Sequence, residues 1–126
     1  MNGNSTLEAV TALLQSHNPE LQMAAVRVLG AIKVQDDNAV KTMGELLVRT
    51  PNPDLRVTVI DVFAELPHPV ALRYLVQSLT RDPATAGRVL QALANAGAAA
   101  VAVLRQQFDT LPMPVRRQAV AILPLI

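Results

Sequence analysis

The chain has 126 residues, of which 51% are hydrophobic and only 2% aromatic, and eleven basic side chains nearly balance ten acidic ones. This apolar content, together with a net charge of only +1, excludes intrinsic disorder. The absence of cysteine excludes a disulfide framework, a thiolate metal centre and a cysteine nucleophile. The length predicts a single domain.

Sequence features of membrane insertion and nucleic-acid binding are missing. The N-terminal residues lack the basic and apolar segments of a secretory signal, and the most apolar stretch, 89–104, is shorter than the roughly 20 residues of a membrane span. Basic residues are mixed with acidic ones along the chain instead of being clustered. We therefore expect a cytoplasmic protein with neither a membrane nor a nucleic acid as partner.

One apolar pattern, with spacings of three, three and one residues, recurs four times at offsets of 33, 32 and 29 residues. Such spacings place the apolar side chains on one side of a helix. The pattern therefore predicts four helices that share a buried side, broken only by Ser78 and Gln107. Its copies are Leu7, Val10, Leu13, Leu14; Val40, Met43, Leu46, Leu47; Leu72, Leu75, Ser78, Leu79; and Val101, Leu104, Gln107, Phe108.

A second pattern follows each of these helices and opens with a proline-containing turn. Asn18-Pro19, Asn52-Pro53 and Asp82-Pro83 are favourable helix starts, because the polar side chain accepts a hydrogen bond from a free backbone N–H and proline needs none. In the fourth copy Met113 takes the proline position. The apolar positions that follow are Ala25, Val26, Leu29, Ile32; Val59, Ile60, Phe63, Leu66; Val89, Leu90, Leu93, Ala96; and Ala119, Val120, Leu123.

The two patterns together predict four helical hairpins and an all-α fold. Short turns make the two helices of a hairpin antiparallel, and no hairpin can bury its apolar side alone, so the hairpins must stack. We therefore expect an α-solenoid in one domain, 1–126, with repeats at about 6–32, 38–66, 69–96 and 98–126. The expected helices are 6–16, 20–32, 38–50, 54–66, 69–81, 84–96, 98–110 and 114–124.

The openings of the second helices carry a family resemblance. Pro19-Glu20-Leu21-Gln22, Pro53-Asp54-Leu55-Arg56 and Val115-Arg116 resemble the D-P-x-V-R-x-x-A signature of HEAT repeats, in particular the short bacterial type similar to the phycobilisome-lyase HEAT-like repeats. The resemblance implies a right-handed superhelix whose second helices line a concave, partner-facing surface. Because Gln22 and Ala86 replace the arginine in two copies, a continuous Asp/Arg ladder between repeats is not expected.

Helical geometry indicates which side chains of the second helices point away from the apolar side. Their charges alternate in sign along the repeats, and we take them as the candidate partner-binding residues. The alternative is an ordinary solvated face with intramolecular ion pairs. The candidates are Arg27, Asp61, Glu65, Arg88, Gln91 and Arg117.

Other residues that could carry chemistry have simpler interpretations. Asp61 and Glu65 lie one helical turn apart, but an open groove lacks the desolvation that acid–base catalysis needs. His17 and His68 are interpreted as turn residues, so we expect no metal site and no cofactor. Gly30 and Gly44 inside helices indicate close helix–helix approach, and Gly97 is expected to end one helix and start the next.

The sequence thus predicts a non-catalytic protein–protein interaction scaffold. The alternatives are a lyase or chaperone-like assistant that binds a tetrapyrrole, which only the family resemblance implies, and a purely structural spacer. The last helix ends in apolar residues, where solenoids usually have a polar cap. We therefore expect either a piece of a longer repeat protein or end-to-end self-association through the apolar C-terminal face.

Overall fold

A computed structural model describes residues 3–66, 68–81 and 83–122. In these residues the chain forms eight α-helices and two short 3₁₀-helices, η1 (Pro83–Thr85) and η2 (Phe108–Thr110), and no β-strand. The α-helices begin and end within three residues of the predicted positions. The fold is the all-α solenoid that the repeated apolar pattern predicts.

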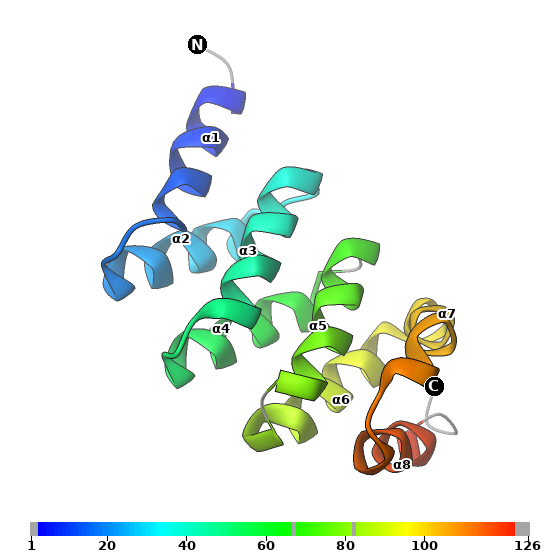
Figure 1. Ribbon diagram of the computed structural model, residues 1–126. Coiled ribbons are helices and arrows are strands. Elements are labelled where there is room, and N and C mark those ends of the chain that lie inside the picture. The colour runs from blue at the N-terminus through cyan, green and yellow to red at the C-terminus, as the bar shows by residue number, and fades with distance from the viewer. Residues whose placement is uncertain (1–2, 67, 82, 123–126) are drawn as a thin grey trace.

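The helices form two layers (Figure 1). Helices α1, α3, α5 and α7 pack side by side in the layer of first helices, and α2, α4, α6 and α8 do so in the layer of second helices. The first helices are α1 (Gly3–Leu13), α3 (Asp37–Arg49), α5 (Pro69–Arg81) and α7 (Ala98–Gln107). The second helices are α2 (Pro19–Ala31), α4 (Pro53–Ala64), α6 (Ala86–Ala96) and α8 (Met113–Ile122).

Polar side chains start the helices as the turn sequences predict. The Asn18 side chain accepts a hydrogen bond from the Glu20 backbone N–H at 2.9 Å, and the Asn52 side chain accepts one from Asp54 at the same distance. Asp36 caps α3 by accepting from the backbone N–H of Ala39. The third predicted cap, Asp82, lies outside the described residues.

Two helix ends differ from the predicted ranges for a local reason. Residues 14–16 follow α1 as a turn whose N–H groups bond three residues back, which tightens the chain out of α-helical geometry. Helix α2 ends in a Schellman motif: the N–H of Val34 bonds to the carbonyl of Leu29, and the N–H of Lys33 bonds to that of Gly30. Lys33 occupies the position with positive φ, 51°, that such a motif requires.

Most apolar positions of both patterns form one continuous core between the two layers. The cluster contains Leu14, directly after α1, as well as Leu47, Leu75 and Leu104 from the later first helices. It also contains second-helix residues such as Phe63, and all of these side chains are fully or almost fully buried. Burial continues from repeat to repeat, as a solenoid requires.

Three positions predicted for the core are exposed instead: Leu13 by 38%, Ile32 by 60% and Val120 by 53%. All three lie in the first or the last hairpin, which has a neighbouring hairpin on one side only in the described chain. Leu66, which is the equivalent of Ile32 in the second repeat, is only 3% exposed. The prediction was wrong for these residues because a shared pattern cannot show which repeats are terminal. Leu123 lies outside the described residues.

The first-helix layer is also held by a buried histidine. His68 precedes α5 and is 6% exposed; its Nδ1 accepts a hydrogen bond from the backbone N–H of Val70. Its Nε2 lies 2.9 Å from Oδ1 of Asp37 at the start of α3. The ring thus fixes the beginnings of two neighbouring helices, besides occupying the turn predicted for it.

Two glycines confirm their predicted roles. A Cβ atom at Gly30 would lie 2.8 Å from a methyl group of Val62, so the absence of a side chain lets α4 approach α2 closely. Gly97 is both the C-cap residue of α6 and the N-cap residue of α7, and its φ is +69°. None of the helices in the described ranges has the length and apolar character needed to cross a membrane.

Candidate functional site

The six candidate partner-binding residues, which we call the second-helix row, lie on α2, α4, α6 and α8 or directly after them. The row comprises Arg27, Asp61, Glu65, Arg88, Gln91 and Arg117, and every one of these residues is exposed. Each helix buries its apolar side in the core, so its opposite side carries these polar groups at the surface. The exposure of these six side chains is as the helical periodicity predicts.

Three residues of the row meet at one hollow between α2 and α4. Arg27 from α2 and Asp61 and Glu65 from α4 contribute to a cavity of about 470 Å³. Gly30 and Val62, the pair at which the two helices approach closely, also line it. A shallow hollow with charged walls is a surface on which a polar segment of another molecule can lie.

An ion pair between α4 and α6 links the row to the next repeat. The Arg88 guanidinium donates to Oδ1 of Asp61 at 2.9 Å, and the two side chains are 52% and 56% exposed. Gln91 bonds to Asn95 on its own helix at 3.3 Å, and Arg117 lies further along the layer on α8. The structure thus joins Arg27, Asp61, Glu65 and Arg88 in one region and places Gln91 and Arg117 along the same layer.

The hollow also contains residues that were not among the predicted anchors. Lys33 and Thr58 line it together with Arg27 and the two carboxylates. Thr58 lies on the outward side of α4 predicted from periodicity, whereas Lys33 follows the end of α2, where periodicity no longer applies. With Lys33 included, two cationic and two anionic side chains surround the hollow.

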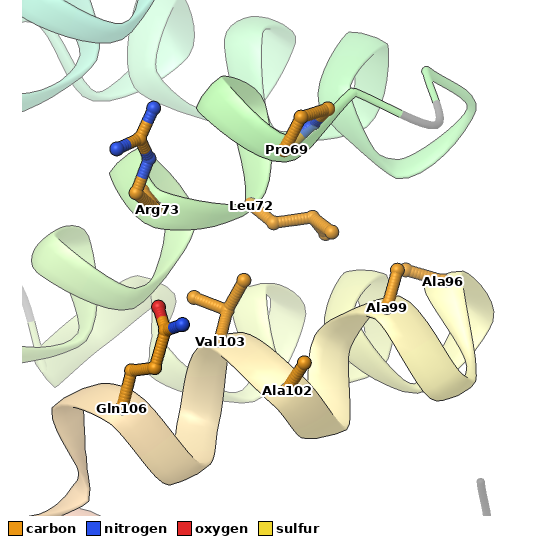
Figure 2. A pocket seen from close by; sticks show the side chains of 8 residues that line it. All are labelled: Pro69, Leu72, Arg73, Ala96, Ala99, Ala102, Val103 and Gln106. Carbon is orange, nitrogen blue, oxygen red and sulfur yellow. The ribbon is translucent and has the colours of Figure 1, made fainter.

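A second, apolar groove lies between α5 and α7 and was not predicted (Figure 2). It has a volume of about 530 Å³; Leu72 and Val103 project into it, and Arg73 and Gln106 lie at one end. The sequence signal that could have revealed it is the run of small residues Ala96, Ala99 and Ala102 at three-residue spacing. Ala99 and Ala102 on α7, together with Ala96 at the end of α6, have side chains too small to fill the space beside α5.

The residues at the arginine position of the HEAT signature act within a hairpin. Arg56 donates to the carbonyl of Thr50 at 2.8 Å, and Gln22, its equivalent in the first repeat, donates to the carbonyl of Leu14 at 3.1 Å. Arg116 donates to the carbonyls of Leu111 and Asp109. These side chains satisfy backbone groups near the end of the preceding first helix. These hydrogen bonds therefore join the start of a second helix to the end of the first helix in the same hairpin.

The two carboxylates of the row, Asp61 and Glu65, lie in open surroundings. Asp61 and Glu65 are both exposed to solvent, and Asp61 is paired with Arg88, so neither carboxylate has the enclosed surroundings of a general acid or base. Within the described ranges, no three His, Asp or Glu side chains come close enough together to hold a metal ion. The row thus presents charged and polar side chains along an exposed surface.

Comparison with known proteins agrees with this architecture. A family model of HEAT repeats matches residues 40–123, which is two-thirds of the chain and includes most of the row. Neither the curated proteins nor the solved structures gave a match. The match to the family model, together with the two layers of stacked helices, shows that this chain belongs to the HEAT-repeat family.

Proposed function

We propose that this protein is a non-catalytic protein–protein interaction module whose partner binds along the second-helix row. The row forms a concave surface built from the second helix of each repeat. HEAT repeats commonly mediate interactions between proteins, so the family itself supports a binding role. The observation that carries the proposal is the convergence of Arg27, Asp61 and Glu65 on one hollow between α2 and α4.

The chemistry of the hollow defines the class of partner. Arg27 and Lys33 line it together with Asp61 and Glu65, and Arg88 adds a further cation beside Asp61. A partner segment that carries both acidic and basic side chains can pair with groups of both kinds. A purely basic or purely acidic segment would bring like charges together, which weakens binding. The partner is therefore a polar protein segment with charges of both signs.

The test is to exchange the charges of the ion pair while keeping the pair itself. In the variant Asp61→Arg/Arg88→Glu the two side chains can still pair between α4 and α6, but the charge pattern presented to a partner is inverted. Binding proteins are captured from source lysate with the wild type and with the variant, and the affinity of each captured partner is then measured with purified components. We expect the variant to lose the specific partner and to keep the wild-type helix content and stability.

A matched control exists in the other layer. Lys41 and Glu45 form an exposed pair on α3, with a distance of 4.0 Å, and the exchange Lys41→Glu/Glu45→Lys alters the charge pattern there by the same amount. This control should capture the partner as the wild type does. Equal capture by both exchanged variants would refute the row as the binding surface.

A further inference from the structure

The groove between α5 and α7 combines an apolar floor with one polar end (Figure 2). Its floor is formed by Leu72 and Val103, which are 2% and 8% exposed. Its α7 wall is low, because Ala99 and Ala102 each carry only a methyl group. The volume of about 530 Å³ falls within the range of about 300–1,000 Å³ that small-molecule sites have. The groove can therefore hold a small ligand against an apolar surface.

The corresponding space one repeat earlier, between α3 and α5, shows how this groove is specialised. By the repeat offset of 29 residues, Val103 takes the place of Tyr74, and Ala102 that of Arg73. The Tyr74 ring lies against Gly44 of α3, and beside it remains a hollow of about 330 Å³ with mostly polar lining residues. Smaller, apolar residues at the equivalent positions of α7 thus make the later space both wider and apolar.

The polar end of the groove carries a cationic side chain. Arg73 lies there on α5, and Gln106 lies there on α7. Arg73 is exposed, and within the described part of the chain its guanidinium forms neither a hydrogen bond nor an ion pair. None of the described residues that line the groove is acidic. A guanidinium binds a carboxylate through two parallel N–H···O bonds, and the Gln106 amide can donate a third, so this end is suited to a carboxylate.

The dimensions of the groove indicate the length of the apolar part of the ligand. Gln106 and Ala99 are seven residues apart on α7, which corresponds to about 10 Å along the helix. An extended hydrocarbon chain of about eight carbon atoms has this length. With its carboxylate at Gln106, such a chain reaches Ala99 with its terminal methyl group. Pro69 and Ala96 line the groove there, so that end is apolar.

We propose that the groove between α5 and α7 binds a free medium-chain aliphatic carboxylate, with the carboxylate at Arg73 and Gln106 and the terminal methyl group beside Ala99. Contact with the apolar floor removes the hydrocarbon chain from water, and the guanidinium fixes its direction. The groove lies in the layer of first helices, whereas the second-helix row lies in the other layer. The two proposals can therefore fail independently of each other.

The first experiment titrates the isotopically labelled chain with sodium octanoate and follows its resonances by NMR spectroscopy. We expect shifts confined to α5, α7 and the end of α6, and nuclear Overhauser contacts from the octanoate terminal methyl group to Ala99. Butanoate should bind about tenfold more weakly or worse, because it lacks four CH₂ groups. The absence of shifts at millimolar octanoate, or shifts spread over the whole chain, would overturn the proposal.

The head group is tested with ligands of the same chain length. Octanol and octylammonium should each bind at least about fivefold more weakly than octanoate, because neither accepts two charge-assisted hydrogen bonds from Arg73. Arg73→Glu should reverse the order and favour octylammonium. The control is Arg49→Glu, the same change at an exposed arginine in the last turn of α3, outside the groove, which should keep the wild-type order. Equal binding of the three ligands, or an unchanged order in Arg73→Glu, would refute the carboxylate assignment.

Filling the groove tests where the hydrocarbon chain lies. Ala102→Leu adds an apolar side chain at an exposed wall position, and leucine is nearly as good a helix former as alanine. The fold should therefore persist, as circular dichroism and urea unfolding can check, while octanoate binds about tenfold more weakly. The control Ala121→Leu, at an exposed position of α8, should bind octanoate as the wild type does. Wild-type affinity in a folded Ala102→Leu variant would place the ligand elsewhere and overturn the proposal.

Discussion

The aromatic ring of Tyr74 on α5 lies against the backbone of Gly44 on α3, in the space that a Cβ atom at position 44 would occupy. Glycine inside a helix costs about 1 kcal/mol relative to alanine. Here that cost is offset by the packing of a large ring, which is partly buried against the core. The contact joins the second and third repeats and allows their first helices to approach closely.

Gly44→Ala should therefore destabilise the protein, although alanine is the better helix former. The added methyl group must displace the Tyr74 ring, and overpacking of this kind costs about 1–3 kcal/mol. The measurement is the free energy of unfolding in urea. The control is Gly87→Ala on α6, where an added Cβ would meet nothing within 4 Å, so this variant should gain about 0.5–1 kcal/mol. If Gly44→Ala were as stable as the wild type, the close contact would be disproved.

The same tyrosine predicts a loss of stability in alkali. Burial raises the pKa of Tyr74, and the negative charge of Glu45 raises it further, against a smaller opposing effect of Arg73. In the unfolded chain tyrosine ionises near pH 10, so above that pH the folded state holds the proton more tightly than the unfolded state does. The contribution of Tyr74 to the free energy of unfolding is therefore constant below about pH 10 and falls as the pH rises above 10.

Comparison with Tyr74→Phe isolates this effect from the titration of lysine and arginine. The difference in unfolding free energy between wild type and variant should be constant from pH 7 to about pH 9 and should shift in favour of the variant at pH 11. Parallel pH profiles of the two proteins would show that the ring ionises in the folded protein as it does in the unfolded chain.

Much of the fold could be predicted because each repeat shows the same pattern. Asn18 and Asn52 start helices as proposed, and the apolar spacing identified core residues such as Leu29 and Phe63. Gly44 was correctly expected at a close approach of helices. These features depend on neighbours in sequence or on a spacing that repeats, and both can be read along a chain.

Features that depend on contacts between distant residues could not be predicted in this way. The exposure of Ile32 depends on which residues pack beside it in the described part of the chain, and its own sequence pattern does not show this. The bond between His68 and Asp37 joins residues 31 positions apart, and the groove between α5 and α7 depends on how far two helices separate. Likewise, the pairing of Asp61 with Arg88 required the spacing between repeats to be known.

Arg116 should stabilise the last hairpin from within. Its guanidinium donates to the carbonyls of Leu111 and Asp109, at 2.9 and 2.6 Å, and lies 5.5 Å from the centre of the Phe108 ring. Arg116→Ala leaves these carbonyls without their donor and should cost about 1–2 kcal/mol of unfolding free energy. The neighbouring exposed residue serves as the control: Arg117→Ala should change stability by less than about 0.5 kcal/mol. Equal stability of the two variants would contradict the structural role of Arg116.

Truncation of a core residue should cost much more stability than truncation of a residue in the row. Leu29 is fully buried, and Leu29→Ala should cost about 2–5 kcal/mol because it leaves a cavity. Asp61→Ala removes only an exposed ion pair with Arg88, which is worth about 0–1 kcal/mol. Urea unfolding of Leu29→Ala and Asp61→Ala measures the two costs. Unfolding of Arg88→Ala and of the double variant Asp61→Ala/Arg88→Ala completes the cycle that gives the coupling within the pair. A coupling well above 1 kcal/mol would make the pair a structural element joining α4 to α6, whereas a small one means that row residues can be changed without harm to the fold. In the latter case any loss of partner binding on substitution of the row reports on recognition itself.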